Sequence, residues 1–193
     1  MSKKFSLPEI KYNSPVIITF ALISFVALIL NYITHGSSNM LLFSVYRSSL
    51  RDALMYPRMF CHVLGHADIS HYMNNFMIIL LVGPMLEEKY GSKRMILMIV
   101  FTAFITGLLF VIFFPRSALL GASGVVFMMI LLSSFANAGK KEIPLTLILV
   151  TVLYLGTEII NGLFSADNVS QLAHIIGGAC GGVFGWLIAN KKM

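Results

Sequence analysis

Polar residues inside long apolar segments are the feature that most constrains the fold of this chain. Ser123 stands at the start of one such segment, His174 lies within another, and His71 and Asn75 lie within a third. Polar side chains at membrane depth are costly, so they usually face the interior of a helix bundle or a water-filled cavity. The pattern therefore predicts that these four side chains face inward and have a function.

The composition places most of the chain in lipid. Hydrophobic residues make up 58% of it and charged residues only 11%, whereas soluble domains have about 45–50% and about 25%. Spanning helices need about 20 mostly apolar residues. We therefore expect an all-α membrane protein, a single domain over residues 1–193 with a short N-terminal tail at 1–14. Its six transmembrane helices are expected at 16–33, 69–86, 94–114, 122–138, 144–164 and 171–189.

Basic residues predict the orientation of these helices. Ten of the fourteen, including every lysine, fall on one side of the expected membrane; the other four are Arg47, Arg51, Arg58 and Arg116. Cytoplasmic loops carry the excess of positive charge, so both termini are expected in the cytoplasm. This asymmetry accounts for the net charge of +6, and no nucleic-acid partner is needed to explain it.

The connection over residues 34–68 is longer than the others. It is rich in apolar side chains yet contains Arg47, Arg51, Asp52 and Arg58. A segment of this kind favours short amphipathic helices in the membrane interface. We expect an interfacial loop between the first two helices, with a structural role favoured over a direct role in substrate binding.

The serine has the surroundings of a nucleophile. Ser123 lies in the sequence Gly-Ala-Ser-Gly at 121–124, at the start of the fourth expected helix. Gly121 and Gly124 allow close approach of the backbone. The helix N-terminus offers unpaired N–H groups and a positive dipole end that stabilise a developing oxyanion. Small residues also occur where membrane helices merely pack, so this motif is weak on its own.

A histidine in the sixth expected helix supplies a general base. His174 is followed by Gly177, Gly181 and Gly185, at offsets that return to nearly the same helix face. Such a face permits the close helix approach that a serine–histidine dyad requires. The alternative is that the glycines only pack helices and the histidine is a buried hydrogen-bonding group.

Histidines also cluster near the second expected helix. His71 and Asn75 are four residues apart, hence on one helix face, and each side chain is a hydrogen-bond donor suited to an oxyanion hole. Interhelical hydrogen bonding is the structural alternative. His62 and His66 precede them, but a zinc site is disfavoured because His-Glu-x-x-His is missing. We expect these two to bind buried backbone or water.

Together these motifs resemble the rhomboid family of intramembrane serine proteases. Residues 71–75 match the family's His-x-x-x-Asn in the second helix, and residues 121–124 match its Gly-x-Ser-Gly at the start of the fourth. Residues 173–181 match its Ala-His-x-x-Gly-x-x-x-Gly in the sixth. The motifs occur in the family's order, which makes the combination far more specific than any one of them.

The resemblance implies a serine endopeptidase that cuts single-span membrane proteins within or near the transmembrane segment. Ser123 would be the nucleophile, and His174 the general base and then acid. His71, Asn75 and the backbone N–H groups of Ser123 and Ala122 would hold the oxyanion. Neither a metal nor a cofactor is implied. The partners would be membrane-protein substrates and the lipid bilayer.

Some positions refine this interpretation. The run from Arg58 to His71 resembles the bacterial branch, and the small core without extensions indicates a bacterial cytoplasmic membrane. The family often has a tyrosine that packs on the histidine where this chain has Phe127, whose ring retains the ability to stack. Asn74 occupies an often aromatic position at the lateral entrance. These departures bear on substrate preference and gating.

Two rival functions remain open at this stage. One is a non-catalytic rhomboid-like factor that binds or remodels membrane proteins, although such relatives usually lack the serine or the histidine. The other is a small transporter or channel that uses the same polar residues as a permeation path. Glu158, the acid well inside the fifth expected helix, is expected at the outer interface or a polar gate rather than in a triad.

Overall fold

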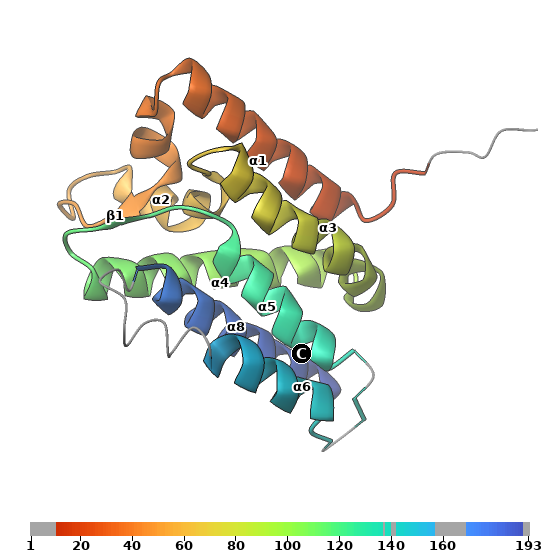
Figure 1. The fold of residues 1–193 in the computed structure, drawn as a ribbon. Coiled ribbons are helices and arrows are strands. Elements are labelled where there is room, and N and C mark those ends of the chain that lie inside the picture. The colour runs from red at the N-terminus through yellow and green to blue at the C-terminus, as the bar shows by residue number, and fades with distance from the viewer. Residues whose placement is uncertain (1–10, 137, 140–141, 157–168, 191–193) are drawn as a thin grey trace, which may run out of the picture.

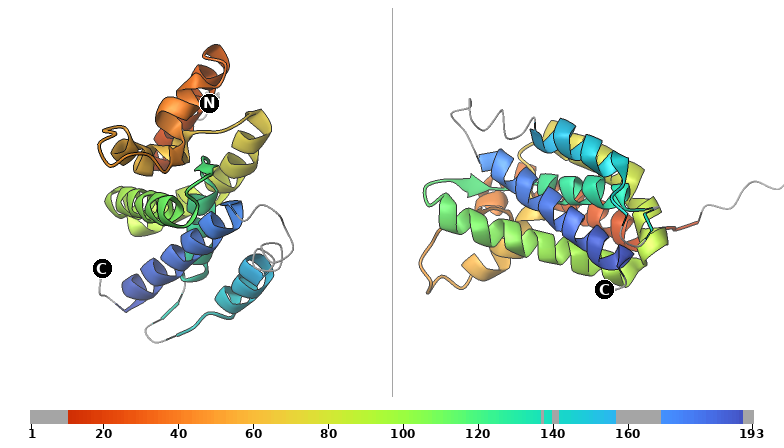
Figure 2. Two further views of the ribbon diagram at one scale, coloured as in Figure 1. Left: turned by 90° about the vertical axis from the view of Figure 1, so that its left-hand side faces the viewer. Right: turned by 90° about the horizontal axis from the view of Figure 1, so that it is seen from below.

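The computed structural model describes residues 11–136, 138–139, 142–156 and 169–190, which form a bundle of helices (Figures 1 and 2). The elements in chain order are α1 (Pro15–Ile33), η1 (Asn39–Phe43), β1 (Val45–Tyr46), α2 (Met55–Cys61), η2 (His62–Leu64), α3 (Ile69–Tyr90), α4 (Ser92–Phe113), β2 (Ala118–Leu119), α5 (Ser123–Ser134), α6 (Leu145–Val150), η3 (Thr151–Leu155) and α8 (Val169–Ala189). Apart from the two short strands, all of these elements are helical.

Four helices in the described residues are long and apolar enough to cross a membrane, namely α1, α3, α4 and α8. They agree with the expected spans at 16–33, 69–86, 94–114 and 171–189. The expected span at 122–138 corresponds to α5, which is apolar but has only 12 residues. The span expected at 144–164 begins with α6 and the π-helical turn η3, and its remainder lies outside the described residues. The count of six spans therefore stays a prediction.

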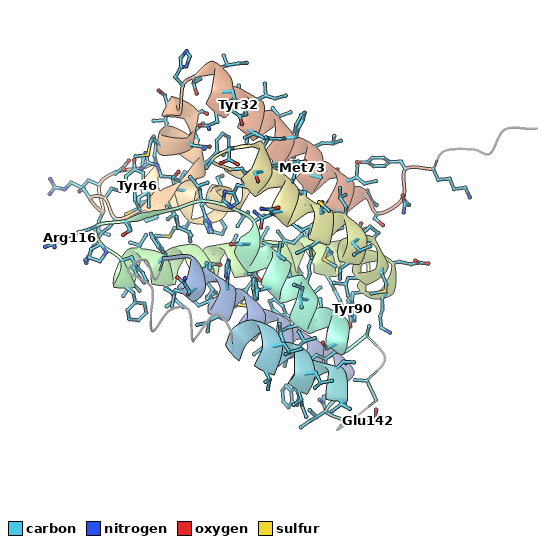
Figure 3. The ribbon with its side chains drawn as sticks, in the orientation of Figure 1. Tyr32, Tyr46, Met73, Tyr90, Arg116 and Glu142 are labelled. Atoms are coloured by element: carbon cyan, nitrogen blue, oxygen red, sulfur yellow. The ribbon has the colours of Figure 1, made fainter. Side chains whose placement is uncertain are left out.

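Segments expected on opposite sides of the membrane lie at opposite ends of the bundle. Tyr46 and Arg116 lie at one end, and Tyr90 and Glu142 lie toward the other (Figure 3). The first pair comes from connections assigned to the outer side, and the second from connections assigned to the lysine-rich side. The connections expected on the two sides of the membrane thus lie at opposite ends of the bundle, as a bundle that spans a membrane requires.

A buried acid joins α1 to α3 and α4. Glu87, 3% exposed, accepts hydrogen bonds from the backbone N–H groups of Val16 at 3.1 Å and Ile17 at 3.0 Å. The Ser92 hydroxyl donates to the same carboxylate at 2.6 Å. The first N–H groups of a helix lack intrahelical acceptors and carry the positive dipole end. Glu87 therefore satisfies the start of α1 and fixes it against the turn between α3 and α4.

The connection between α1 and α3 is held against the segment that leads into α5. Strands β1 and β2 pair antiparallel, with Val45 opposite Leu119 and Tyr46 opposite Ala118. This small ladder links residues before α2 to residues just before the expected catalytic serine. The long connection is thus folded onto the bundle as short helices and a strand.

Arg58 organises this connection from within. It is 4% exposed, and its Nε donates to the Leu41 carbonyl at 2.9 Å. Its Nη1 donates to Asp52 at 2.9 Å, and its guanidinium lies 4.5 Å from the centre of the Tyr46 ring. A buried guanidinium needs such partners to offset its desolvation. The contacts bring three parts of the connection together around one side chain.

Helices α5 and α8 are neighbours in the bundle (Figure 1), and their backbones are in direct contact. A Cβ atom placed on Gly177 would overlap the backbone of Gly124, and one on Gly181 would overlap the Met128 carbonyl. At Gly185 it would meet the Phe135 ring. Glycine at these positions therefore allows van der Waals contact between helix backbones, which holds membrane helices together.

Adding a methyl group at this interface is expected to destabilise the fold. Gly181→Ala places a Cβ against the Met128 carbonyl, so we expect a loss of about 1–3 kcal/mol from overpacking. The control is Gly182→Ala, because nothing lies within 4 Å of a Cβ at Gly182 and alanine favours helix. Thermal unfolding in detergent measures both variants. Equal melting temperatures would contradict the close packing.

Candidate active site

The expected nucleophile stands at the first residue of α5. Ser123 begins the helix, and Ala122 before it is fully buried. The N–H groups at this point of a helix have no preceding turn to pair with, and the helix dipole adds positive potential. The structure thus places a hydroxyl and backbone donors at the same helix end, where negative charge is stabilised.

The expected base lies on α8 against the same part of α5. The His174 imidazole stacks on the Phe127 ring, with centroids 4.4 Å apart and planes at 10°. Ser123 and Phe127 are four residues apart and so share one helix face. A Cβ at Gly124 would lie 3.3 Å from the Ala173 carbonyl oxygen, which places the starts of α5 and α8 side by side. Ser123 and His174 therefore come from facing turns of two tightly packed helices.

The expected oxyanion donors on α3 lie beside the loop that precedes Ser123. Gly121 has a φ of 120°, in a region that favours glycine. A Cβ there would lie 2.7 Å from Nε2 of His71 and 3.9 Å from Nδ2 of Asn75. Both the backbone conformation and the lack of space therefore require glycine. The close fit brings the side chains of His71 and Asn75 to the start of α5.

The turn that carries these donors is fixed by its own hydrogen bonds. Asp68 is the N-cap of α3, and its Oδ1 accepts a hydrogen bond from the His71 backbone N–H at 2.8 Å. One turn later, Nδ2 of Asn75 donates to the His71 carbonyl at 3.0 Å. Because capping satisfies a donor that would otherwise be unpaired, Asp68 holds the turn in which His71 lies.

His62 connects the same loop to α4. Its ring Nε2 lies 3.0 Å from the Ala103 carbonyl oxygen, and its own carbonyl accepts a hydrogen bond from the Gly121 N–H at 2.9 Å. The carbonyl of Ala103 only accepts, so Nε2 carries the proton. Burial lowers the pKa of the His62 imidazole to about 4, which keeps it neutral. His62 thus holds the loop before Ser123 against α4.

His66 is a second buried histidine, and it is in contact with His71. It is fully buried, with Nδ1 3.2 Å from the Leu64 carbonyl oxygen. Its ring packs edge-on to that of His71, with centroids 5.0 Å apart, and burial lowers its pKa to about 4. The expectation that His62 and His66 bind buried backbone is confirmed. Within the described ranges no three His, Cys, Asp or Glu side chains converge as a metal site.

The structure adds two residues that the motifs did not single out. Asp68 is recognisable as a helix cap because it directly precedes an apolar helix. Thr106 of α4 lies against Gly124, with its Cγ2 3.4 Å from a Cβ placed there, a contact that no local pattern signals. Glu158 lies outside the described residues.

The comparisons with known proteins agree with this geometry. The family model described as "Rhomboid domain" matches residues 53–191, which include every residue of the site described above. The chain belongs to the rhomboid family. The expectation drawn from its ordered motifs is thereby confirmed.

Two curated rhomboid relatives are similar to this chain. "RHOMBOID-like protein 4" from Arabidopsis thaliana is 28% identical over 130 residues, which are 64% of this chain and 32% of the relative. "Rhomboid-related protein 1" from Caenorhabditis elegans is 32% identical over 136 residues, 64% of this chain and 37% of the relative. The chain spans about a third of the length of these relatives. Since both come from eukaryotes, they lend no support to the expected bacterial origin.

For the serine-protease activity proposed below, removal of the cap at Asp68 is expected to slow cleavage without weakening substrate binding. Asp68→Ala leaves the His71 N–H without its acceptor, and a lost cap costs about 1 kcal/mol. The cap holds the turn of the proposed oxyanion donor His71, so a cost of this size is expected to lower kcat about fivefold with KM nearly unchanged. Steady-state cleavage of a transmembrane substrate measures both constants.

Two variants control this experiment. Asp68→Asn keeps a capping oxygen and is expected to behave like the wild type. Ser70→Ala changes an exposed residue in the same turn and is expected to have no effect. A loss in Asp68→Asn as large as that in Asp68→Ala would contradict the capping role.

The buried histidines predict a stability that falls with acid. His62 and His66 have pKa values of about 4 in the folded protein, against an ordinary 6.5. Between these values the unfolded chain binds protons that the folded chain excludes. The free energy of unfolding therefore falls as the pH falls through this window and is fully retained above it.

The His62→Gln variant tests this dependence. Its amide retains a donor for the Ala103 carbonyl but does not titrate, so the loss of stability between about pH 7 and about pH 4.5 is expected to become smaller. Chemical unfolding at several pH values measures the slope. The same slope in the variant and the wild type would show that His62 is not one of the groups responsible.

Proposed function

We propose that this rhomboid-family protein is an intramembrane serine endopeptidase that uses a Ser123–His174 dyad. The observation that carries the proposal is the backbone contact between α5 and α8. It supports the proposal because Ser123 is the first residue of α5, Gly124 next to it lies against Ala173 next to His174, and the His174 imidazole stacks on Phe127, one turn after the serine. A nucleophile, a base and a positive helix end at one position are what acyl transfer requires.

The proposed reaction proceeds in two halves. The Ser123 hydroxyl attacks the peptide carbonyl while His174 takes its proton, which gives a tetrahedral oxyanion. When the intermediate collapses, the C–N bond breaks and His174 returns the proton to the leaving amine. Water then attacks the acyl-enzyme with His174 again as the base, which releases the new carboxylate and restores Ser123.

The oxyanion is held by donors from two elements. The side chains of His71 and Asn75 approach from α3, and the backbone N–H groups of Ser123 and Ala122 contribute from α5. The fit of Gly121 against His71 supports this assignment, since it brings α3 to the start of α5. Loss of one such donor typically slows catalysis about a hundred- to a thousandfold.

The location of the site suggests the class of substrate. Ser123 and His174 lie among helices that are suited to span a membrane, so the accessible peptide bonds belong to other membrane segments. We propose single-span membrane proteins, cut within or near the transmembrane segment where their helix unwinds. We also propose that the chain forms a domain of six membrane-spanning helices with both termini in the cytoplasm. All groups in the mechanism come from the chain, so it requires neither a metal nor a cofactor.

Loss of either member of the dyad is expected to abolish cleavage. We expect purified wild-type protein in detergent to cut a generic single-span substrate. Ser123→Ala and His174→Ala should each reduce kcat at least about a thousandfold. Gel analysis of the products measures the effect, and circular dichroism verifies that the variants are folded.

Ser134→Ala is the matched control, because Ser134 lies at the opposite end of α5. It is expected to retain wild-type activity. Cleavage by Ser123→Ala would refute the nucleophile. A folded wild type that cuts none of several substrates would instead favour a non-catalytic factor that binds membrane proteins.

A further inference from the structure

Two apolar grooves lie along α4 and share a wall. The larger has a volume of about 630 Å³ and lies between α1, α4 and the end of α2. The smaller has a volume of about 320 Å³ and lies between α2, α4 and α8. Phe60 and Val100 line both, and the Phe60 ring stacks on that of Phe104 at 5.3 Å. Other lining residues are Ile23, Ile96, Leu97, Phe101 and Phe184.

The walls of these grooves are suited to hydrocarbon. Their apolar residues stay exposed: Ile96 by 49%, Leu97 by 54% and Val100 by 45%. Since α1, α4 and α8 are all suited to span a membrane, the grooves open sideways into the acyl-chain region. None of their residues belongs to the proposed catalytic site. Two adjacent apolar grooves match the two acyl chains of a phospholipid.

Basic residues stand at the end of both grooves. Lys93 is three and seven residues before Ile96 and Val100, so it lies on the helix face of the larger groove. Arg94 has the same spacing to Leu97 and Phe101, which line the smaller one. Both cations are exposed, in the first turn of α4. The wall of each groove thus continues along its helix face to a positive charge.

The neighbouring groups at this end fit the headgroup region. Tyr12, 62% exposed, bonds through its hydroxyl to that of Thr19 at 2.9 Å, and Thr19 lines the larger groove. Exposed aromatic and basic side chains are typical of the membrane–water interface. Of the two acids at the end of α3, Glu87 is buried and bonded to Val16, Ile17 and Ser92. Glu88 is exposed, but the exposed cations Lys89, Lys93 and Arg94 outnumber it.

We propose that this face binds one anionic phospholipid, with an acyl chain in each groove and its phosphate at Lys93 and Arg94. The shared wall of Phe60 and Val100 separates the two chains. Basic residues at the end of a membrane helix attract anionic lipid headgroups, and the lysine-rich end carries this pair. The site is independent of Ser123, so its occupancy can be measured whether or not the protein is a protease.

The test is competitive lipid binding to the purified full chain. Native mass spectrometry in detergent measures retention of dioleoylphosphatidylglycerol and dioleoylphosphatidylcholine from an equimolar mixture. We expect the wild type to retain the anionic lipid preferentially. Lys93→Gln should lower this preference about fivefold. Lys89→Gln, which removes an exposed lysine at the end of α3, is the charge-matched control and should change it less.

A second pair of variants tests the grooves. Val100→Trp fills the wall that both grooves share and is expected to reduce retention of either lipid. Ile112→Trp adds the same ring at a position of α4 that is 53% exposed, against 45% for Val100. Ile112 lines neither groove, so this variant should behave as the wild type. Equal retention of the two lipids, or equal losses within either pair of variants, would overturn the proposal.

Discussion

Contact between the backbones of α5 and α8 is the constraint on which the remaining site geometry depends. Gly177 and Gly181 bring α8 against the carbonyl groups of Gly124 and Met128. In lipid there is no hydrophobic force to press two apolar helices together, so close van der Waals contact has to supply the attraction. The same contact sets the distance between a helix start that carries a hydroxyl and a turn that carries an imidazole.

The rest of the site is assembled by polar contacts, some buried and some exposed. His62 binds α4 through its ring and the loop at Gly121 through its backbone. Asp68 caps the turn that contains His71. His62 is buried, and a buried polar group costs free energy unless it is paired, so its two contacts are specific to one arrangement of the chain. The Asp68 contact is exposed and acts as a helix cap. The proposed nucleophile, base and oxyanion donors thereby come from three helices held in one relative position.

Local patterns of the sequence predicted part of this arrangement. The apolar spans and the motifs at 71–75, 121–124 and 173–181 are read within single helices, and the long helices agree with them. Hydropathy predicts an apolar segment as far as Ala138, whereas α5 ends at Ser134, because hydropathy does not register the bonds that close a helix. The N–H of Phe135 bonds to the Leu132 carbonyl, and such tightened bonds end a helix at Ser134. Likewise, the contact between Gly121 and His71 joins distant segments, so it became visible only in three dimensions.

The buried carboxylate of Glu87 has a consequence for where the domain begins. The family match starts at residue 53, which leaves α1 outside it, yet Glu87 inside the match accepts the first N–H groups of α1. A polypeptide that started at the homology boundary would leave this acid with only the Ser92 hydroxyl of its three partners, and a buried acid that loses its partners is costly. The cooperative unit of this protein is therefore larger than its recognisable homology, and α1 belongs to it as an integral part.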